Sequence, residues 1–340
     1  MIKRIFPSLT GILLLLITFA RGAEIRKYAG EFMAGGVGAR ALGMGGAYVA
    51  VTGDVTFGYW NPAGLSSIRY PELGFMHARR FGGVVNYDYF GGALPVTRRE
   101  TIGVNVVRLA VDDIPITALP RPDLPLDATY TDGKGNTLSN RPCQVRTVND
   151  AEYAVYLSYA RMQTGRFAWG ASAKLVHKGV GDNAAWGAGF DLGAIWLPWR
   201  SLRLGANLQD FTTTLLAWDT GERELVSPTL KLGGAYPFIF RPLKSRLLLA
   251  ADADLRMEGR KLAAQAHYGP MSADFHLGAE WVFHNIASVR IGSDTGCLSA
   301  GAGLRLPRID VDYAFLKHDQ LDNSHRISLR VRIEERKARK

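Results

Sequence analysis

The first pattern with chemical meaning is a glycine-rich run near the N-terminus. Gly36, Gly38 and Ala41 match the G-x-G-x-x-A spacing of dinucleotide-binding turns, and Asp54 lies within reach for a ribose-binding acid. That interpretation needs a preceding strand and a β-α-β unit. Here a short apolar run precedes the glycines, and segments typical of antiparallel strands follow them. The glycines more plausibly let a compact segment pack inside a narrow space.

Nucleophiles, bases and metal ligands are scattered along the chain. No serine lies in a G-x-S-x-G frame, and Cys143 and Cys297 lack the paired spacing of a zinc site. We therefore expect no enzyme activity, cofactor or metal, although distant strands can assemble an active site without any motif. The histidines are His77, His177, His267, His276, His284, His318 and His325.

Acidic residues at alternating positions form a second pattern. Asp252 and Asp254 share one face of their segment, and Asp310 and Asp312 share one face of another. We interpret these aspartates and four arginines as charge-paired packing of an interior, with an ion-conducting path as the alternative. The arginines expected on the same inward face are Arg203, Arg290, Arg305 and Arg330.

The elements that position these side chains are expected to be β-strands, because period-two alternation dominates from about residue 72 onward. In the last segment Ile327 and Leu329 alternate with Arg326, Ser328 and Arg330. We count fourteen segments: 72–81, 84–95, 101–110, 150–162, 166–178, 183–197, 200–210, 227–238, 245–256, 273–283, 286–294, 297–305, 308–317 and 324–333.

Three features place these strands in a membrane rather than in a soluble sandwich. The segments have about the length that crosses a bilayer at a tilt, and aromatic residues gather near their ends. The long connections at 111–149, 211–226 and 257–272 all fall on one side, and short turns fall on the other. An even strand number also closes the sheet. We predict an all-β, antiparallel transmembrane barrel with long outer loops.

The N-terminus predicts export. Lys3 and Arg4 precede an apolar run, 11–20, that is too short to span a bilayer, and small residues follow. This pattern is typical of a signal peptide, which we place at 1–22. The net charge of +10 is scattered, so we assign it to surface and barrel lining and expect no nucleic-acid partner.

The two cysteines fall on the same side in this topology. Cys143 lies in the predicted outer loop 111–149, and Cys297 begins a strand at the outer rim. That side is oxidising in an exported protein, so a disulfide between them is one option and two free thiols are the other.

The segment Gly36–Ile68 resembles the PorV/PorQ family of outer-membrane proteins. The family's Gly-Ala-Arg-x-x-Gly-Met-Gly-Gly-Ala run corresponds to Gly38–Ala47, and its Asn-Pro-Ala-Gly-Leu element to Asn61–Leu65. The end of the chain, Asp312–Ile333, also looks like the family's final hairpin. The Asn-Pro-Ala-Gly element is shared more loosely with FadL-type transporters. The resemblance implies a FadL-like barrel of fourteen strands with an N-terminal hatch.

The residues of this motif are interpreted as structural. Pro62 fixes its own φ, Asn61 before it is pushed into an extended conformation, and Gly64 is expected to take a left-handed one. The predicted hatch and turn residues are Gly38, Arg40, Gly43, Gly45, Gly46, Asn61, Pro62 and Gly64.

The resemblance implies two functions for a protein of the Gram-negative outer membrane. PorV-like members bind exported cargo in type IX secretion, and we take this as the main prediction. The expected partners are outer-membrane lipid and, through the outer loops, secreted protein cargo or secretion-machinery proteins. FadL-like transport of hydrophobic molecules is the alternative, and it predicts an apolar pocket between hatch and wall. The predicted division is 1–22 signal peptide, 23–68 hatch, 69–333 barrel and 334–340 charged tail.

Overall fold

The computed structural model describes residues 24–25, 30–199, 201–260, 263–317 and 322–333. The predicted signal peptide and charged tail lie outside the described residues. Within the described ranges, no helix is both long and apolar enough to cross a membrane.

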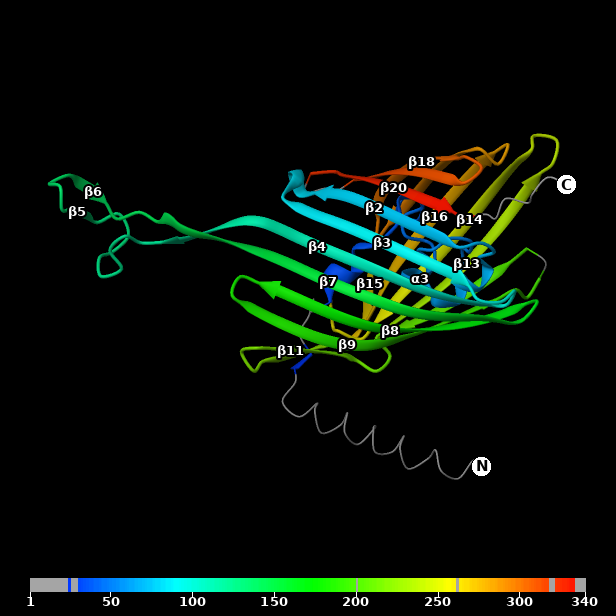
Figure 1. Ribbon diagram of the computed structural model, residues 1–340, viewed down its shortest axis with the longest axis horizontal. Helices are drawn as coiled ribbons and strands as arrows, with labels where there is room; N and C mark the ends of the chain where they lie inside the picture. The colour runs from blue at the N-terminus through cyan, green and yellow to red at the C-terminus, as the bar shows by residue number, and fades with distance from the viewer. Residues whose placement is uncertain (1–23, 26–29, 200, 261–262, 318–321, 334–340) are drawn as a thin grey trace, which may run out of the picture.

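Fourteen antiparallel strands form a closed barrel, as the alternation predicts (Figure 1). Each strand pairs with the next along the chain, and β20 pairs with β2 to close the sheet. The strands are β2 (Glu72–Arg80), β3 (Val85–Pro95), β4 (Glu100–Ala118), β7 (Cys143–Thr164), β8 (Phe167–Val180), β9 (Asn183–Trp196), β10 (Arg203–Gln209), β13 (Thr229–Phe240), β14 (Ser245–Arg256), β16 (Met271–Phe283), β17 (Ala287–Asp294), β18 (Cys297–Arg305), β19 (Ile309–Leu316) and β20 (Ser324–Arg332).

The two faces of this sheet meet different surroundings. On β20, Arg326 and Arg330 are buried inside, whereas Ile327 and Leu329 are exposed on the outer wall. This is the arrangement of a transmembrane barrel, with apolar residues toward lipid. One end of the barrel carries the turns after β3, β7, β13, β16 and β18, and we call it the short-turn end. The opposite end is the long-loop end.

The long-loop end carries a feature that was predicted as a loop. Strands β4 and β7 continue beyond the barrel and pair as far as Ala118 and Cys143, with register shifts along the way. Residues 111–149 therefore form an ordered two-stranded projection, which we call the arm (Figure 1). The predicted strands 101–110 and 150–162 were therefore too short on this side, because alternating apolar residues such as Ile114 and Ile116 continue the strand pattern beyond the barrel.

The tip of the arm is organised by one buried side chain. The Asn140 amide donates to the carbonyl oxygens of Arg121, Leu124 and Pro125, at 2.8, 2.9 and 3.1 Å. A small hairpin of β5 (Thr129–Thr131) and β6 (Thr137–Ser139) completes the tip. The other two predicted loops also contain strands. These are β11 (Thr214–Trp218), β12 (Arg223–Val226) and β15 (Ala266–Tyr268), and β12 also pairs in parallel with β1 (Glu24–Ile25).

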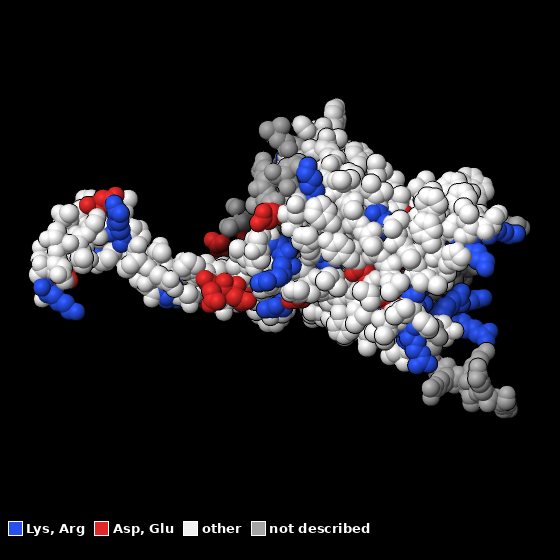
Figure 2. Space-filling view, turned by 90° about the horizontal axis from the view of Figure 1, so that it is seen from above, with Lys and Arg blue, Asp and Glu red and all other residues white. Residues whose placement is uncertain are grey.

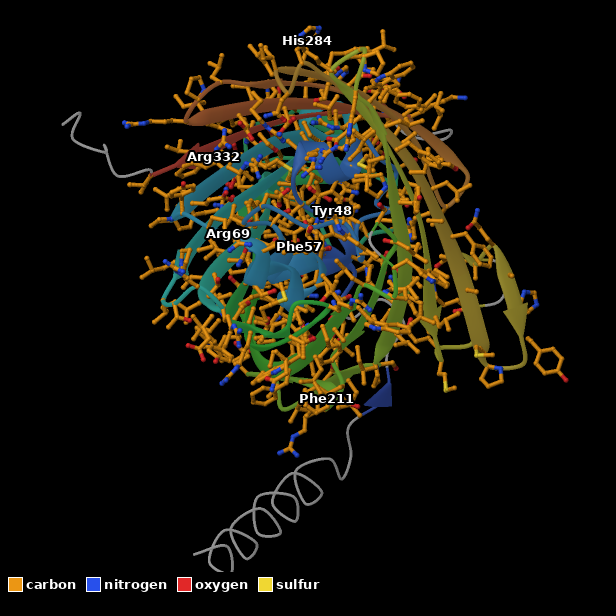
Figure 3. The ribbon with its side chains drawn as sticks, turned by 90° about the vertical axis from the view of Figure 1, so that its right-hand side faces the viewer. Tyr48, Phe57, Arg69, Phe211, His284 and Arg332 are labelled. Carbon is orange, nitrogen blue, oxygen red and sulfur yellow. The ribbon has the colours of Figure 1, made fainter. Side chains whose placement is uncertain are left out.

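The predicted hatch fills the barrel. Its short elements are η1 (Glu31–Gly35), α2 (Ala39–Leu42), α3 (Phe57–Trp60) and η2 (Pro62–Ser67). Figure 3 looks into the barrel from the short-turn end and shows Tyr48 and Phe57 near the centre of the ring of strands. Both side chains are fully buried, as are Met44 and Leu65. The hydrophobic core therefore lies in the lumen, between residues 30–68 (hereafter the hatch) and the wall.

Candidate functional site in the plugged lumen

The wall touches the hatch through glycines. At Gly278 an added Cβ would lie 2.3 Å from the carbonyl oxygen of Met44, and at Gly292 it would lie 2.2 Å from the nitrogen of Gly45. Both distances are too short for any other residue, so the hatch backbone packs directly on the backbone of the wall. The glycines of the wall that meet the hatch, here called the contact glycines, are Gly74, Gly103, Gly170, Gly193, Gly205, Gly233, Gly278 and Gly292.

Arg40 is the main charged link between hatch and wall. From α2 it donates two hydrogen bonds to Glu280 on β16, at 2.8 and 2.7 Å, and both side chains are buried. Arg290 on β17 donates to the same carboxylate at 2.8 Å. A buried carboxylate shared by two guanidinium groups is stabilised in its charged form. The sequence singled out Arg40, but it did not identify Glu280 as its partner.

Asp54 is a second charged group of the hatch. It accepts hydrogen bonds from the hydroxyl of Tyr48 and from the backbone N–H and hydroxyl of Thr56. Burial by itself would raise the pKa of Asp54, but Arg330 and Arg40 outweigh it and hold that pKa below its usual range. Asp54 is therefore a buried anion that links the hatch to β20, rather than a ribose-binding acid.

Side chains of the wall also form hydrogen bonds with backbone groups of the hatch. Asp252 on β14 accepts from the N–H groups of Tyr48 and Val49, at 2.5 and 2.7 Å. Arg326 on β20 donates to the carbonyl of Gly35 at 2.8 Å. Turns with few internal hydrogen bonds would otherwise leave buried backbone groups unpaired, at considerable cost. These contacts and the contact glycines together hold the hatch as a fixed plug.

The predicted charge pairing of the interior holds for most of its members. Arg290 contacts Asp312 at 2.7 Å, Arg330 contacts Asp310, and Arg305 lies 3.5 Å from Asp310. Asp254 pairs instead with Lys231 at 2.9 Å and His276 at 3.7 Å. Arg203 has no ion pair with any residue that the structure describes.

The Asn-Pro-Ala-Gly element behaves as predicted at two positions and differently at a third. Asn61 is extended (φ −168°, ψ 104°), its side chain caps η2 by accepting from Ala63, and Pro62 is the first residue of η2. Gly64 lies inside η2, so its predicted left-handed conformation was wrong. Glycine is needed there for space, because a Cβ would lie 2.1 Å from the Phe57 ring.

The glycines of the other motif serve both conformation and space. Gly38, Gly45 and Gly46 have φ values of 81°, 64° and 76°, a region that other residues rarely adopt. Gly43 has an ordinary right-handed conformation, and its Cβ would lie 3.1 Å from the Cα of Gly301 on β18.

The two cysteines are free in the structure. Cys143 is exposed on the arm, and Cys297 is partly buried at the start of β18. Strands β7 and β18 are not neighbours in the sheet. The structure thus has two free thiols, and a disulfide between them stays a prediction.

A break in the wall was not anticipated. Strand β9 pairs with β10 up to Leu208 and with β11 from Leu215, and the residues between form a bulge in the ladder. Asp210 and Thr213 in the bulge have φ values of 54° and 60°. The Asp210 side chain is buried on the lumen side. Bulges of this kind interrupt pairing and redirect side chains.

A buried ionic cluster fills the inner side of this bulge. The Lys174 ammonium lies 3.2 Å from Asp191 and 2.7 Å from Asp210, and the Thr214 hydroxyl donates to Asp210. We call Lys174, Asp191, Asp210 and Thr214 the bulge cluster. The sequence signal that points toward it is an inward lysine on one alternating strand and an inward aspartate on the next strand.

A cavity of about 50 Å³ adjoins the bulge cluster, between the hatch and the wall. Met33 of the hatch lies on one side, and Tyr156, Gln209 and Lys231 of the wall lie on the other. Charged and amide groups dominate its lining. It is therefore not the apolar pocket that the FadL-type alternative predicted for the space between hatch and wall.

Comparison with known proteins gives fold relatives. No family model matches the chain, and no curated protein matches it. Among solved structures, the toluene transporter TbuX of Ralstonia pickettii is 14% identical, with 88% of this chain and 99% of that chain covered and a TM-score of 0.58. The CymD monoaromatic hydrocarbon channel is also 14% identical, covering 88% and 98%, with a TM-score of 0.56.

A third solved structure, a FadL homologue of Pseudomonas aeruginosa, is 12% identical, with 86% of this chain and 97% of that chain covered and a TM-score of 0.53. At these identities the likeness establishes the fold alone. The chain thus has the fold of the FadL-like β-barrels. The narrower resemblance to the PorV/PorQ family stays a prediction, since none of the comparisons tests it.

Proposed function

We propose that the protein is a FadL-like outer-membrane channel that passes small hydrophobic molecules sideways through its wall at the bulge. The observation that carries this proposal is the bulge cluster, which lies where the ladder is interrupted and beside the cavity in the lumen. The proposal favours transport over the secretion role that the family resemblance placed first.

A sideways route follows from the way the hatch is held. Movement along the barrel axis would require the contact glycines to part from the hatch and the Arg40–Glu280 link to break. Movement at the bulge requires displacement of the Lys174, Asp191 and Asp210 side chains but leaves the hatch in place, because the ladder between β9 and the residues after β10 lacks regular pairing there. Outside the bulge, the rings of Phe190 and Phe211 lie 6.3 Å apart on the exposed wall. An apolar molecule that leaves the bulge would therefore enter an apolar environment.

The solved relatives support the ligand class. TbuX is described as a toluene transporter and CymD as a monoaromatic hydrocarbon channel. We therefore infer a small apolar or aromatic ligand for this chain. The direct test is uptake of labelled toluene by Gram-negative cells with a lipopolysaccharide outer membrane, because a plain phospholipid bilayer is itself permeable to toluene. We expect faster uptake in cells that produce the protein than in matched cells without it, and no increase for a polar solute of similar size. Equal uptake of toluene with and without the protein would refute the proposal.

A second candidate function is protein binding at the cell surface, and the arm is the observation that favours it. The arm is ordered although it projects beyond the barrel, and its tip is fixed by Asn140. An ordered projection binds a partner without the entropic cost of ordering a flexible loop. Deleting 115–140 should abolish co-purification of exported proteins while toluene uptake is unchanged. Retained binding after the deletion would exclude the arm as the contact surface.

A further inference from the structure

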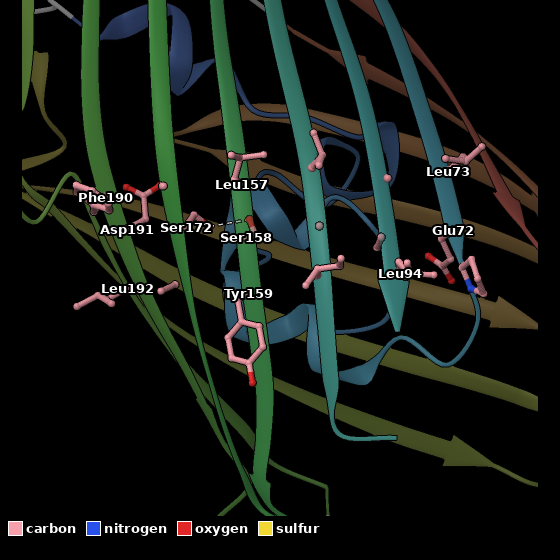
Figure 4. A pocket seen from close by; sticks show the side chains of 18 of the residues that line it. Glu72, Leu73, Leu94, Leu157, Ser158, Tyr159, Ser172, Phe190, Asp191 and Leu192 are labelled. Carbon is pink, nitrogen blue, oxygen red and sulfur yellow. Dashed lines mark hydrogen bonds between the residues drawn. The ribbon is translucent and has the colours of Figure 1, made fainter. Parts of the chain in front are cut away.

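The outer wall carries an apolar groove of about 810 Å³ over strands β2, β3, β4, β7, β8 and β9 (Figure 4). This volume is within the range of about 300–1,000 Å³ that is typical of small-molecule sites. The groove faces the membrane, because large apolar side chains that line it, such as Ile102, Leu157 and Phe190, are exposed on the outer wall. Inward residues of the same strands, such as Ser158, Ser172 and Asp191, contribute only to its floor. The apolar side chains that line it include Leu94, Ile102, Leu157, Tyr159, Phe190 and Leu192.

The groove exists because small residues alternate with large ones across neighbouring strands. On β8 the outward residues are Ala171 and Ala173, which line its floor. Tyr159 and Leu157 of β7 lie opposite these two alanines on one side. Leu192 and Phe190 of β9 lie opposite them on the other side. The groove therefore runs along β8, between aliphatic and aromatic side chains of the two neighbouring strands.

The end of the groove nearest the short turns is strongly basic. Figure 2 shows Lys and Arg side chains gathered at this end of the molecule. Glu100, the acidic residue at this edge, is already engaged, since Tyr159 donates to it at 3.0 Å and Arg161 lies 3.3 Å away. The exposed arginines of the nearby turns and strand ends are Arg69, Arg98, Arg99, Arg161 and Arg166.

We propose that this groove is a binding site for an anionic phospholipid, with an acyl chain along β8 and the phosphate at the arginines. An apolar groove at membrane depth with cations at one end fits an amphiphile that has one anionic end. Aromatic side chains mark the same level, where the rings of Tyr159 and Trp169 lie 5.6 Å apart. The proposal rests on the groove and its basic end rather than on transport, although Phe190 and Phe211 line both the groove and the proposed exit from the bulge.

A second copy of the chain is a poorer occupant of the groove. Two barrels in one membrane that met by twofold symmetry at β8 would bring their arginine-rich ends together. Guanidinium groups such as those of Arg161 and Arg166 would then face like charges across the interface. A phospholipid phosphate instead neutralises them.

The test of the basic end is lipid retention measured by native mass spectrometry, in detergent micelles doped with phosphatidylglycerol or phosphatidylcholine. The wild type should retain phosphatidylglycerol preferentially. Arg99→Gln and Arg166→Gln should each reduce its retention roughly fivefold, because a cation near a lipid headgroup contributes about that factor. The matched control is Arg121→Gln with Lys134→Gln at the arm tip, which should leave retention unchanged. Equal retention of both lipids by the wild type would overturn the proposal.

The apolar part of the groove is tested with substitutions that change the size of a side chain rather than its charge. Ala171→Phe and Ala173→Phe fill the floor from the outer face, so the barrel interior is not disturbed. We expect both variants to lose bound phosphatidylglycerol, whereas Ala188→Phe, which is exposed on β9 outside the groove, should retain it. Unchanged retention in the filled variants would overturn the proposal, as would a dimer in the wild type that the filled variants abolish.

Discussion

Arg40 of the hatch and Glu280 of strand β16 are joined by two hydrogen bonds, of 2.8 and 2.7 Å, where both side chains are buried. The two residues are far apart in the sequence, and their pairing connects the plug to the wall it closes. Since Glu280 also accepts from Arg290, one carboxylate is shared between a cation of the hatch and a cation of the wall, and Asp312 supplies the second negative charge beside Arg290. This relationship makes the hatch an integral part of the barrel.

Arg40→Met is therefore expected to loosen the hatch. It keeps most of the apolar side chain but removes the charge, and breaking a buried pair costs about 3 kcal/mol or more. Hydrogen exchange of the hatch amides should accelerate on the order of a hundredfold. The control is Arg121→Gln, which removes an exposed arm-tip pair and should have no measurable effect. Unchanged hatch exchange in Arg40→Met would show that the link is dispensable.

Gly233 and Gly234 offer a matched pair on β13. At Gly233 a Cβ would lie 2.9 Å from the Cβ of Val49 and 2.2 Å from Asp252, whereas at Gly234 the nearest atom is 3.8 Å away, on Leu204. Gly233→Val should lower the unfolding temperature and expose the hatch to protease. Gly234→Val should do neither, because it faces outward. Similar behaviour of the two variants would contradict the role of the contact glycines.

Acid should weaken the hold on the hatch through Asp54. Its pKa lies below the usual value of about 3.9, because Arg330 and Arg40 outweigh the effect of burial. Above a pH of about 3.9 the charged form of Asp54 contributes its full stabilisation to the folded state. This stabilisation is lost as the pH falls from that value through the lower pKa that Asp54 has in the folded protein. Limited proteolysis of the hatch between pH 7 and pH 3 measures this loss. Asp54→Asn should be cleaved faster at pH 7 and depend less on acid, and an unchanged acid profile would refute the assignment.

The barrel was predictable because the two faces of each strand meet different surroundings, lipid on one side and the lumen on the other. Alternating residues such as Arg326 and Ile327 face the lumen and the lipid in turn, and this pattern does not depend on which strands are neighbours. The arm was missed as structure because neither of its faces meets lipid. Its order depends on Asn140, whose carbonyl partners lie elsewhere in the tip.

The candidate site was less predictable, since its geometry is set by segments distant in sequence. Arg40 and Asn61 were singled out by a motif, but Glu280 is recognisable only as one inward acid among several. The need for glycine at Gly278 comes from Met44, a residue of the hatch. The bulge cluster likewise combines Lys174 of β8 with aspartates of β9 and the bulge, and no local spacing indicates that combination.

The central claim is passage at the bulge, and a reversible crosslink there tests it most directly. A Cβ at Gly189 would lie 3.0 Å from the Cβ of Thr214, so a small shift brings the pair to the separation of about 3.8 Å found in disulfides. In a background with Cys143 and Cys297 replaced by serine, Gly189→Cys with Thr214→Cys would tie β9 to β11. In cells with a lipopolysaccharide outer membrane, oxidation should slow toluene uptake to the rate of cells without the protein, and reduction should restore it. Uptake that is equally fast in the oxidised and reduced states would contradict a route through the bulge.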